Sequence, residues 1–300
     1  MTDRPESADF RAERMRLPPE SFAIAPEVDE PPTDPIDAQT WRGLVWLTDD
    51  VSLRTSEHHG TVLQHAYAVW GDWISLVLDV QALAANPAVD PLAVAAMGAG
   101  EEFQASISLA LTGFYRQAIG TLRAVLESML AALDLSVRNE PAAVSAWLEG
   151  AHDGMFWTSR VRRRLSNLEP FSQFRTEEDS LFADAGWFAW LYEVLCAFVH
   201  GRPAHTNAAG RRIETTNGGL WQSNGPIYVD DVFDMWARLF FNTMLISALM
   251  AGLSRPALVA LSTPTGLSLE AFVMRLMDWH PAPGVPRVAA IVAEHLMPST

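Results

Sequence analysis

The chain has 300 residues, of which 49% are apolar, which is enough to bury one large hydrophobic core. Its formal net charge is −15 and all 21 basic residues are arginines, so wrapping of extended DNA is excluded, because phosphate contacts need clustered cations. A single cysteine excludes an internal disulfide and fits a reducing compartment. The first residues are charged and do not resemble a signal peptide, and no long window is free of charge. We therefore predict a soluble, cytoplasmic protein that does not enter membranes.

The first 37 residues form an acidic segment rich in proline. They hold seven prolines, ten acidic residues and four arginines, and bury too little apolar area to offset the entropy of ordering. We therefore predict a disordered or loosely packed tail over residues 1–37. Apolar spacing then predicts helices over 38–57 and 61–85, and the sequence His58-His59-Gly60 breaks the helical pattern between them.

The next segment begins with a helix-start signal. Asp90 is a preferred N-cap residue and Pro91 suits the first helical position, so we expect a helix from there up to Gly113. A further helix over 114–137 follows almost at once. A junction this short makes the two helices antiparallel neighbours.

Two more helices and a segment of different character come next. Asn139 and Pro141 predict the start of a helix that continues to about Ser166. Residues 181–199 predict a core helix, because they are apolar on nearly every side. Residues 204–229 hold turns rich in glycine and asparagine around short apolar stretches, and predict a long loop or a small irregular hairpin.

The C-terminal part returns to helical patterns. Asp230 or Asp231 is expected to cap a long helix that runs to Leu253. Two shorter helices are predicted over 267–279 and 285–296, separated by prolines.

The predicted architecture follows from these elements, since no internal repeat and no alternation of strands and helices is present. We expect an all-α protein. Residues 38–255 form an antiparallel helical bundle with a small β-hairpin or irregular loop insertion near 204–229. Residues 256–300 form a C-terminal helical extension.

Two of the predicted helices carry polar stripes that indicate a site. The helix over 114–137 has a stripe made of Arg116, Arg123 and Glu127. The helix over 181–199 has one small or polar stripe, which ends in Glu193, Cys196 and His200. We expect the stripes to face each other and to bring Arg123, Glu127 and His200 into one cluster. Arg123 should lie within salt-bridge reach of Glu127 or Glu193.

Each candidate has a functional and a structural interpretation. Arg123 and Glu127 either hold a substrate carboxylate or phosphate, or form a half-buried structural ion pair. His200 either acts as a general acid or base, or caps the last carbonyls of its helix. Cys196 is better explained as core filling than as a metal ligand or thiolate, and the other histidines match no metal spacing, so we expect no metal and no cofactor.

A dense basic run lies near the end of the helix predicted to reach Ser166. It consists of Arg160, Arg162, Arg163 and Arg164. The run either contacts RNA or a phosphorylated partner, or is a solvated face that offsets the surrounding acidity.

The two polar helices together resemble a known family. The motif Tyr-Arg-Gln-Ala-x-x-x-Leu-Arg-x-x-x-Glu over 115–127 is followed by Tyr-x-x-Leu-Cys-x-x-Val-His-Gly over 192–201. This pair is similar to a group of bacterial helical proteins of the HEPN superfamily, and the resemblance covers about residues 95–253. It implies a short antiparallel bundle whose relatives include ribonuclease toxins, defence proteins and their inactive relatives.

The resemblance also implies which residues form the site and how the protein assembles. Tyr192, which lies in the second motif, is one further site-forming residue, and Arg202 joins it from the polar cluster that follows His200 in the sequence. HEPN-like proteins often pair through bundle faces, and this chain has more aromatic residues near its C-terminal helix than that helix needs to bury. We therefore predict a homodimer that uses Trp221, Trp236, Phe240 and Phe241.

One departure from the family pattern bears on activity. Nuclease members carry an arginine that is separated from the histidine by four to six residues, whereas this chain has Glu193-Val194-Leu195 at those positions, and only His200 carries over. We therefore expect a binding or regulatory module in bacterial stress response or phage defence, acting on a protein partner or RNA. One alternative is a metal-independent ribonuclease, with His200 as base and Arg123 or Arg202 stabilising the phosphorane. The other is a small-ligand sensor with its pocket at the expected cluster.

Overall fold

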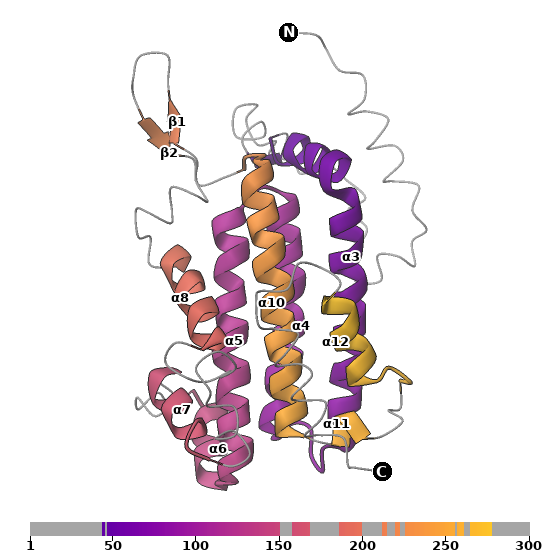
Figure 1. The fold of residues 1–300 in the computed structure, drawn as a ribbon, viewed down its shortest axis with the longest axis vertical. Coiled ribbons are helices and arrows are strands. Elements are labelled where there is room, and N and C mark those ends of the chain that lie inside the picture. The colour runs from indigo at the N-terminus through magenta and orange to yellow at the C-terminus, as the bar shows by residue number, and fades with distance from the viewer. Residues whose placement is uncertain are drawn as a thin grey trace, which may run out of the picture. The chain divides into compact units, whose positions relative to one another are not determined.

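The computed structural model describes residues 44–45, 47–150, 158–168, 186–199, 212–214, 220–222, 226–255, 257–260 and 265–277. All of these residues belong to one compact unit. Within it, helices pack against one another, so the predicted all-α fold is confirmed (Figure 1). The acidic tail and the last predicted helix lie outside the described residues.

The first long helix, α3 (Leu47–Leu83), bends once (Figure 1). The backbone of His59 has φ −124° and ψ 19°, outside the helical region. The bend therefore occurs where the sequence pattern predicted a break. The two parts of α3 correspond to the helices predicted over 38–57 and 61–85, and the second ends two residues early.

The next helix, α4 (Pro91–Leu111), begins as predicted. Asp90 is its N-cap, and a carboxylate oxygen of Asp90 accepts a hydrogen bond of 2.9 Å from the backbone N–H of Ala93. Two indole N–H groups of α3 donate to backbone carbonyls of α4, Trp70 to Gly100 and Trp73 to Ala96. The tryptophan later in α3 bonds to the residue earlier in α4, so the two helices are antiparallel.

A tight turn at Gly113 joins α4 to α5 (Tyr115–Arg138). Gly113 has φ +80°, a conformation that side chains with a Cβ avoid. An added Cβ would lie only 2.4 Å from the carbonyl oxygen of Ile227. The turn thus fixes both the antiparallel pairing of α4 with α5 and the approach of the segment that precedes α10.

The region after α5 corrects two predicted ranges. Helix α6 (Pro141–Leu148) ends before Gly150, which has φ +74°, and α7 (Thr158–Leu165) is a separate helix. The predicted continuous helix from Pro141 to Ser166 is therefore wrong. Helix α8 (Trp187–Val199) follows a bend at Gly186, so it begins later than the predicted start at 181, because glycine is a poor helix former.

A short hairpin lies in the segment predicted to contain one. Strands β1 (Arg212–Glu214) and β2 (Leu220–Gln222) pair antiparallel, with Ile213 opposite Trp221. The insertion near 204–229 therefore includes a small β-hairpin, as expected.

Helix α10 (Asp230–Ser254) is the centre of the bundle (Figure 1). It contacts α3, α4, α5, α8 and α12 (Leu269–Met277), and α11 (Ala257–Ala260) joins its end to α12. Every residue over 239–253 is buried. Among the described residues, α10 is the one helix long and apolar enough to cross a membrane, but 89% of its most apolar window is buried in the bundle, as in the core helix of a soluble protein.

Two expectations about α10 are corrected. Its N-cap is Val229, and neither Asp230 nor Asp231 caps it; both lie in the first helical turn. Trp236 and Phe240 are fully buried and Phe241 is almost so, because they pack on α3 and α4 within the chain. These aromatic side chains are therefore unavailable to a dimer interface, and the side chain of Trp221 lies outside the described residues.

Candidate functional site

Helices α5 and α8 lie side by side, as their polar stripes predicted (Figure 1). Arg123 on α5 forms the expected ion pair with Glu127, one turn further along the same helix. Its Nη2 and Nε atoms donate to the same carboxylate oxygen, Oε1 of Glu127, at 2.8 and 3.0 Å. The predicted salt bridge of Arg123 is therefore confirmed, with Glu127 as the partner.

Tyr192 connects this ion pair to α8. Its hydroxyl donates to Oε1 of Glu127 at 2.6 Å, and Nη2 of Arg123 lies 3.4 Å from the same hydroxyl. The guanidinium carbon of Arg123 lies 5.6 Å from the centre of the Tyr192 ring, within range of a cation–π interaction. The ring of Phe188, four residues earlier on α8, stacks on the ring of Tyr192. We call Arg123, Glu127 and Tyr192 the α5–α8 triad.

The pKa values of Tyr192 and Arg123 are both raised within the triad. Burial and the hydrogen bond to Glu127 raise the pKa of Tyr192 to about 12, so the phenol stays neutral. Burial acts to lower the pKa of Arg123, but the hydrogen bond and charge of Glu127 outweigh it and raise that pKa. The triad is thus one cation and one anion, and each hydrogen-bonds within the group.

Arg116 binds the end of α8. Its Nε donates to the carbonyl oxygen of Phe198 at 3.1 Å, and its Nη2 to that of Val199 at 3.5 Å. These are terminal carbonyls of a helix, which a guanidinium satisfies while also interacting favourably with the helix dipole. Arg116 therefore holds the C-terminus of α8 against α5.

The other predicted residues of this site have separate outcomes. Glu193 is exposed to solvent, while Cys196 is half-buried and interacts with Tyr192 and Arg123. His200 and Arg202 lie outside the described residues, so the expected meeting of His200 with Arg123 stays a prediction.

The basic run lies on α7, where one arginine has a structural role. Nε of Arg164 donates to Oδ1 of Asp134 on α5 at 2.6 Å, and a second bond joins Nη2 of Arg164 to Oδ2. The Asp134 side chain is fully buried, and Arg138 lies 3.6 Å from it. Arg160 and Arg163 are exposed and Arg162 is half-buried. The run therefore ties α7 to α5 through Arg164 as well as presenting cations to solvent.

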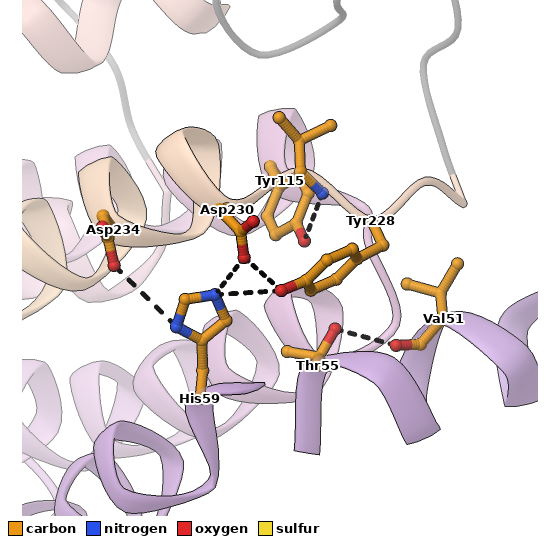
Figure 2. Close-up of polar contacts among 8 residues, drawn as sticks. Val51, Thr55, His59, Tyr115, Tyr228, Asp230 and Asp234 are labelled. Carbon is orange, nitrogen blue, oxygen red and sulfur yellow. Dashed lines mark hydrogen bonds and ion pairs between the residues drawn. The ribbon is translucent and has the colours of Figure 1, made fainter. Parts of the chain in front are cut away.

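A second polar cluster, which sequence reasoning missed, lies at the bend of α3 (Figure 2). Nε2 of His59 is 3.0 Å from Oδ1 of Asp230, and Nδ1 of His59 is 3.9 Å from Oδ1 of Asp234. The hydroxyl of Tyr228 donates to the same oxygen of Asp230 and lies 3.5 Å from Nε2 of His59. We call His59, Tyr228, Asp230 and Asp234 the α3–α10 cluster.

The α3–α10 cluster packs against an aromatic ring and contains two acidic groups whose pKa values are shifted. The His59 ring stacks on Phe233 with ring centres 4.2 Å apart. The hydrogen bond from Tyr228, together with His59, holds the pKa of Asp230 below its usual range although desolvation opposes this. Burial and the bond to Asp230 raise the pKa of Tyr228. The sequence carried two signals for this cluster. They are the two adjacent histidines at a helix break and the two carboxylates four residues apart at a helix start.

The described residues line a cavity of about 520 Å³, and it is not at the α5–α8 triad. It lies where the turn between α3 and α4, the start of α6 and the end of α10 meet. Asp90 and Arg255, two of its charged residues, already form an ion pair with each other. This cavity therefore does not coincide with the α5–α8 triad, beside which the sequence predicted the pocket of a ligand sensor.

Neither a metal site nor a similar protein points to the function of this site. The described part of the chain has no group of three or more His, Cys, Asp or Glu side chains that could hold a metal ion. Comparison with protein-family models, with curated proteins and with solved structures gave no match.

Proposed function

We propose that the protein is a non-enzymatic binding module of HEPN-like architecture, which acts on a protein partner in the bacterial cytoplasm during stress response or phage defence. The closed α5–α8 triad carries this proposal. Its carboxylate accepts hydrogen bonds from both Arg123 and Tyr192, so its charges are already paired. The two family-like motifs also lie on neighbouring helices, which supports the HEPN-like architecture.

The triad argues against a ribonuclease that uses Arg123. A nuclease needs a cation placed to stabilise the charge that develops on the phosphorane. Arg123 is neutralised by Glu127, and Arg116 is bound to the terminal carbonyls of α8. Both arginines of the α5 stripe are therefore engaged in holding the two helices together.

A protein partner fits the chain better than RNA. The net charge of −15 opposes a polyanion, and Arg164 of the basic run is paired with buried Asp134. On α8, two residues before Tyr192, the aromatic side chain of Trp190 is exposed, with 48% accessible. Glu193, three residues further on and therefore on the same side of the helix, is exposed as well. Tryptophan is among the residues that most often anchor protein interfaces, so we expect this side of α8 to meet the partner.

The absence of catalysis is tested with RNA. The purified protein and its His200→Ala variant are incubated with total cellular RNA in a chelator-containing buffer, and the products are separated on denaturing gels. We expect neither protein to degrade RNA above the buffer control. Cleavage by the wild type that is lost in His200→Ala would replace this proposal with the ribonuclease alternative.

The binding surface is tested by partner capture from the native host. Tagged wild-type protein, Trp190→Ala and Met274→Ala are compared; Met274 is similarly exposed but lies on α12. We expect the wild type and Met274→Ala to retain one stoichiometric protein that Trp190→Ala loses. Binding in a direct titration with the purified partner should weaken at least tenfold, the loss of a typical anchor residue. Equal retention by all three proteins would show that α8 is not the interface.

A further inference from the structure

The bend of α3 places an imidazole between two carboxylates. In Figure 2 the two ring nitrogens of His59 point in different directions, Nε2 toward Asp230 and Nδ1 toward Asp234. Only 12% of the His59 side chain is exposed, whereas both aspartates are mostly solvent-accessible. The histidine is therefore held in the joint between α3 and α10, and the aspartates approach it from the solvent side of α10.

The number of hydrogen bonds that His59 can donate depends on its charge. A neutral imidazole has one N–H group, so it can donate to only one of the two aspartates and turns a lone pair toward the other. A cationic imidazole has two N–H groups and turns one toward each aspartate, although the 3.9 Å between Nδ1 and Asp234 is too long for a hydrogen bond. Histidine is the side chain that ordinarily changes charge between about pH 5 and 8. The connection between the two helices therefore gains an ionic attraction to both carboxylates in acid.

We propose that His59 is a proton-operated latch, which fastens the bend of α3 to the first turn of α10 in mildly acidic solution and loosens it as the pH rises. The proposal rests on the placement of the ring at a break in the helix and between two carboxylates. It does not depend on the proposed function of α8.

The other titratable groups around the ring leave this direction unchanged. The hydrogen bond that Tyr228, just before α10, donates to Asp230 helps to keep Asp230 ionised in mild acid, because it holds the pKa of that carboxyl below its usual range. The Tyr228 phenol stays neutral, since burial and the bond to Asp230 raise its pKa. On α5, burial raises the pKa of Tyr115, whose oxygen accepts from the N–H of Val229.

His58 is the remaining basic neighbour and the natural control. It precedes His59 in α3 and is exposed, and its ring centre lies 5.4 Å from that of Tyr228. Its charge also acts on Asp230, but it does not bridge two carboxylates. Asp231 lies in the same first turn of α10 and adds negative charge there. A pH response that comes from general charge attraction would therefore depend on His58 as well as on His59.

The segment that the latch controls is the part of α3 before the bend. Thr55 and Val51 on that part are buried, and the side chain of Val51 approaches the turn at Gly113. Releasing the latch should let residues 47–58 detach more often from this end of the bundle. Because local opening exposes backbone amides, hydrogen exchange measures it directly.

The test is hydrogen–deuterium exchange of the full-length protein at about pH 5.5 and about pH 7.5, corrected for the intrinsic pH dependence of exchange. Peptides that cover 47–58 report on the latch, and peptides from α5 serve as an internal reference. We expect the protection of 47–58 to fall several-fold at the higher pH while that of α5 is unchanged. In His59→Gln the difference between the two pH values should disappear, and in His58→Gln it should remain.

Each outcome decides the proposal. Unchanged protection of 47–58 between the two pH values would overturn it, and so would a pH response that survives in His59→Gln. A response lost equally in His58→Gln would assign the effect to general charge. If His59→Gln does not fold, Asp234→Asn alters only an exposed side chain on α10 and should reduce the pH response. A full response in Asp234→Asn would then contradict the latch.

Discussion

At the scale of single residues, the Arg123–Glu127 pair lies between a surface and a buried ion pair. The side chain of Arg123 is 21% exposed and that of Glu127 is 39% exposed. Solvent therefore screens part of the attraction, and the strong cost of stranding a charge in a dry core does not apply in full. The pair nevertheless binds Tyr192 on the neighbouring helix, so its removal acts on more than one helix.

Removing Glu127 should destabilise the fold moderately. Glu127→Leu deletes the acceptor of the hydrogen bonds from Arg123 and Tyr192, and we expect a loss of about 1–2 kcal/mol in the free energy of unfolding. Arg123→Met should lose about 1 kcal/mol, and the double variant should show a coupling energy of about 1 kcal/mol. Chemical denaturation of all three variants measures these values. Small, additive losses would mean that the pair serves a ligand and not the fold.

Tyr192 should make stability depend on alkaline pH. Its folded-state pKa is raised to about 12 by burial and by Glu127, above the value of about 10 in an unfolded chain. Its contribution is therefore complete below about pH 10 and is lost as the pH rises through 12. Stability measured by denaturation at about pH 9 and about pH 11 should fall less in Tyr192→Phe than in the wild type. Equal falls would place the titration on other tyrosines.

At the scale of elements, the turn at Gly113 joins three parts of the fold. It ends α4, begins α5 and lies against Ile227, which precedes the central helix. The positive φ and the close backbone approach both require a residue without a Cβ. A local signal in the sequence, glycine between two helices, therefore coincides with a tertiary contact that the sequence does not display.

Two glycine substitutions should have opposite effects. Gly113→Ala combines a left-handed backbone, at about 1–2 kcal/mol, with overpacking against Ile227, at about 1–3 kcal/mol, so we expect a loss of about 2–5 kcal/mol. Gly71→Ala is the matched control, because Gly71 lies within α3 and an added Cβ meets nothing within 4 Å. It should gain about 0.5–1 kcal/mol from helix propensity. Thermal and chemical denaturation measure both, and a tolerated Gly113→Ala would contradict the tight turn.

At the scale of the whole molecule, a homodimer stays a prediction but needs another surface. Trp236, Phe240 and Phe241 are buried within the chain. The outer face of α3 exposes Tyr67 and Leu78, and the residues between them on that face, Gly71 and Ser75, are small. This face is uncharged in a chain of net charge −15, so two copies can approach there with the least repulsion. An antiparallel pairing would place Tyr67 of one copy against Leu78 of the other.

The oligomeric state can be measured by light scattering at micromolar concentrations. We expect a mass of twice 33.0 kDa for the wild type, a shift to the monomer mass for Leu78→Glu, and no change for Met274→Glu. Leu78 and Met274 are both exposed, but only Leu78 lies on the outer face of α3. A wild-type mass of 33.0 kDa would contradict the dimer, and a dimer that survives Leu78→Glu would place it elsewhere.

The sequence by itself determined the features that depend on neighbours along the chain. The Asp90-Pro91 start of α4, the Gly113 turn, the break near His59 and the pair of Arg123 with Glu127 are all encoded within five residues, where caps, φ preferences and helical spacing act. The all-α class followed from the same periodicity, because helices repeat every few residues.

Only the tertiary structure decided which segments meet. His59 and Asp230 are 171 residues apart, and nothing in the local pattern of either indicates the other. The same contact explains why Asp230 does not cap α10, because its carboxylate is bound to His59 and Tyr228. The burial of residues 239–253 of α10 on all sides likewise depends on the helices around them. The packing of the whole core decides which distant segments pair. A periodic pattern of apolar residues is compatible with many arrangements of the helices, whereas the folded chain adopts one of them.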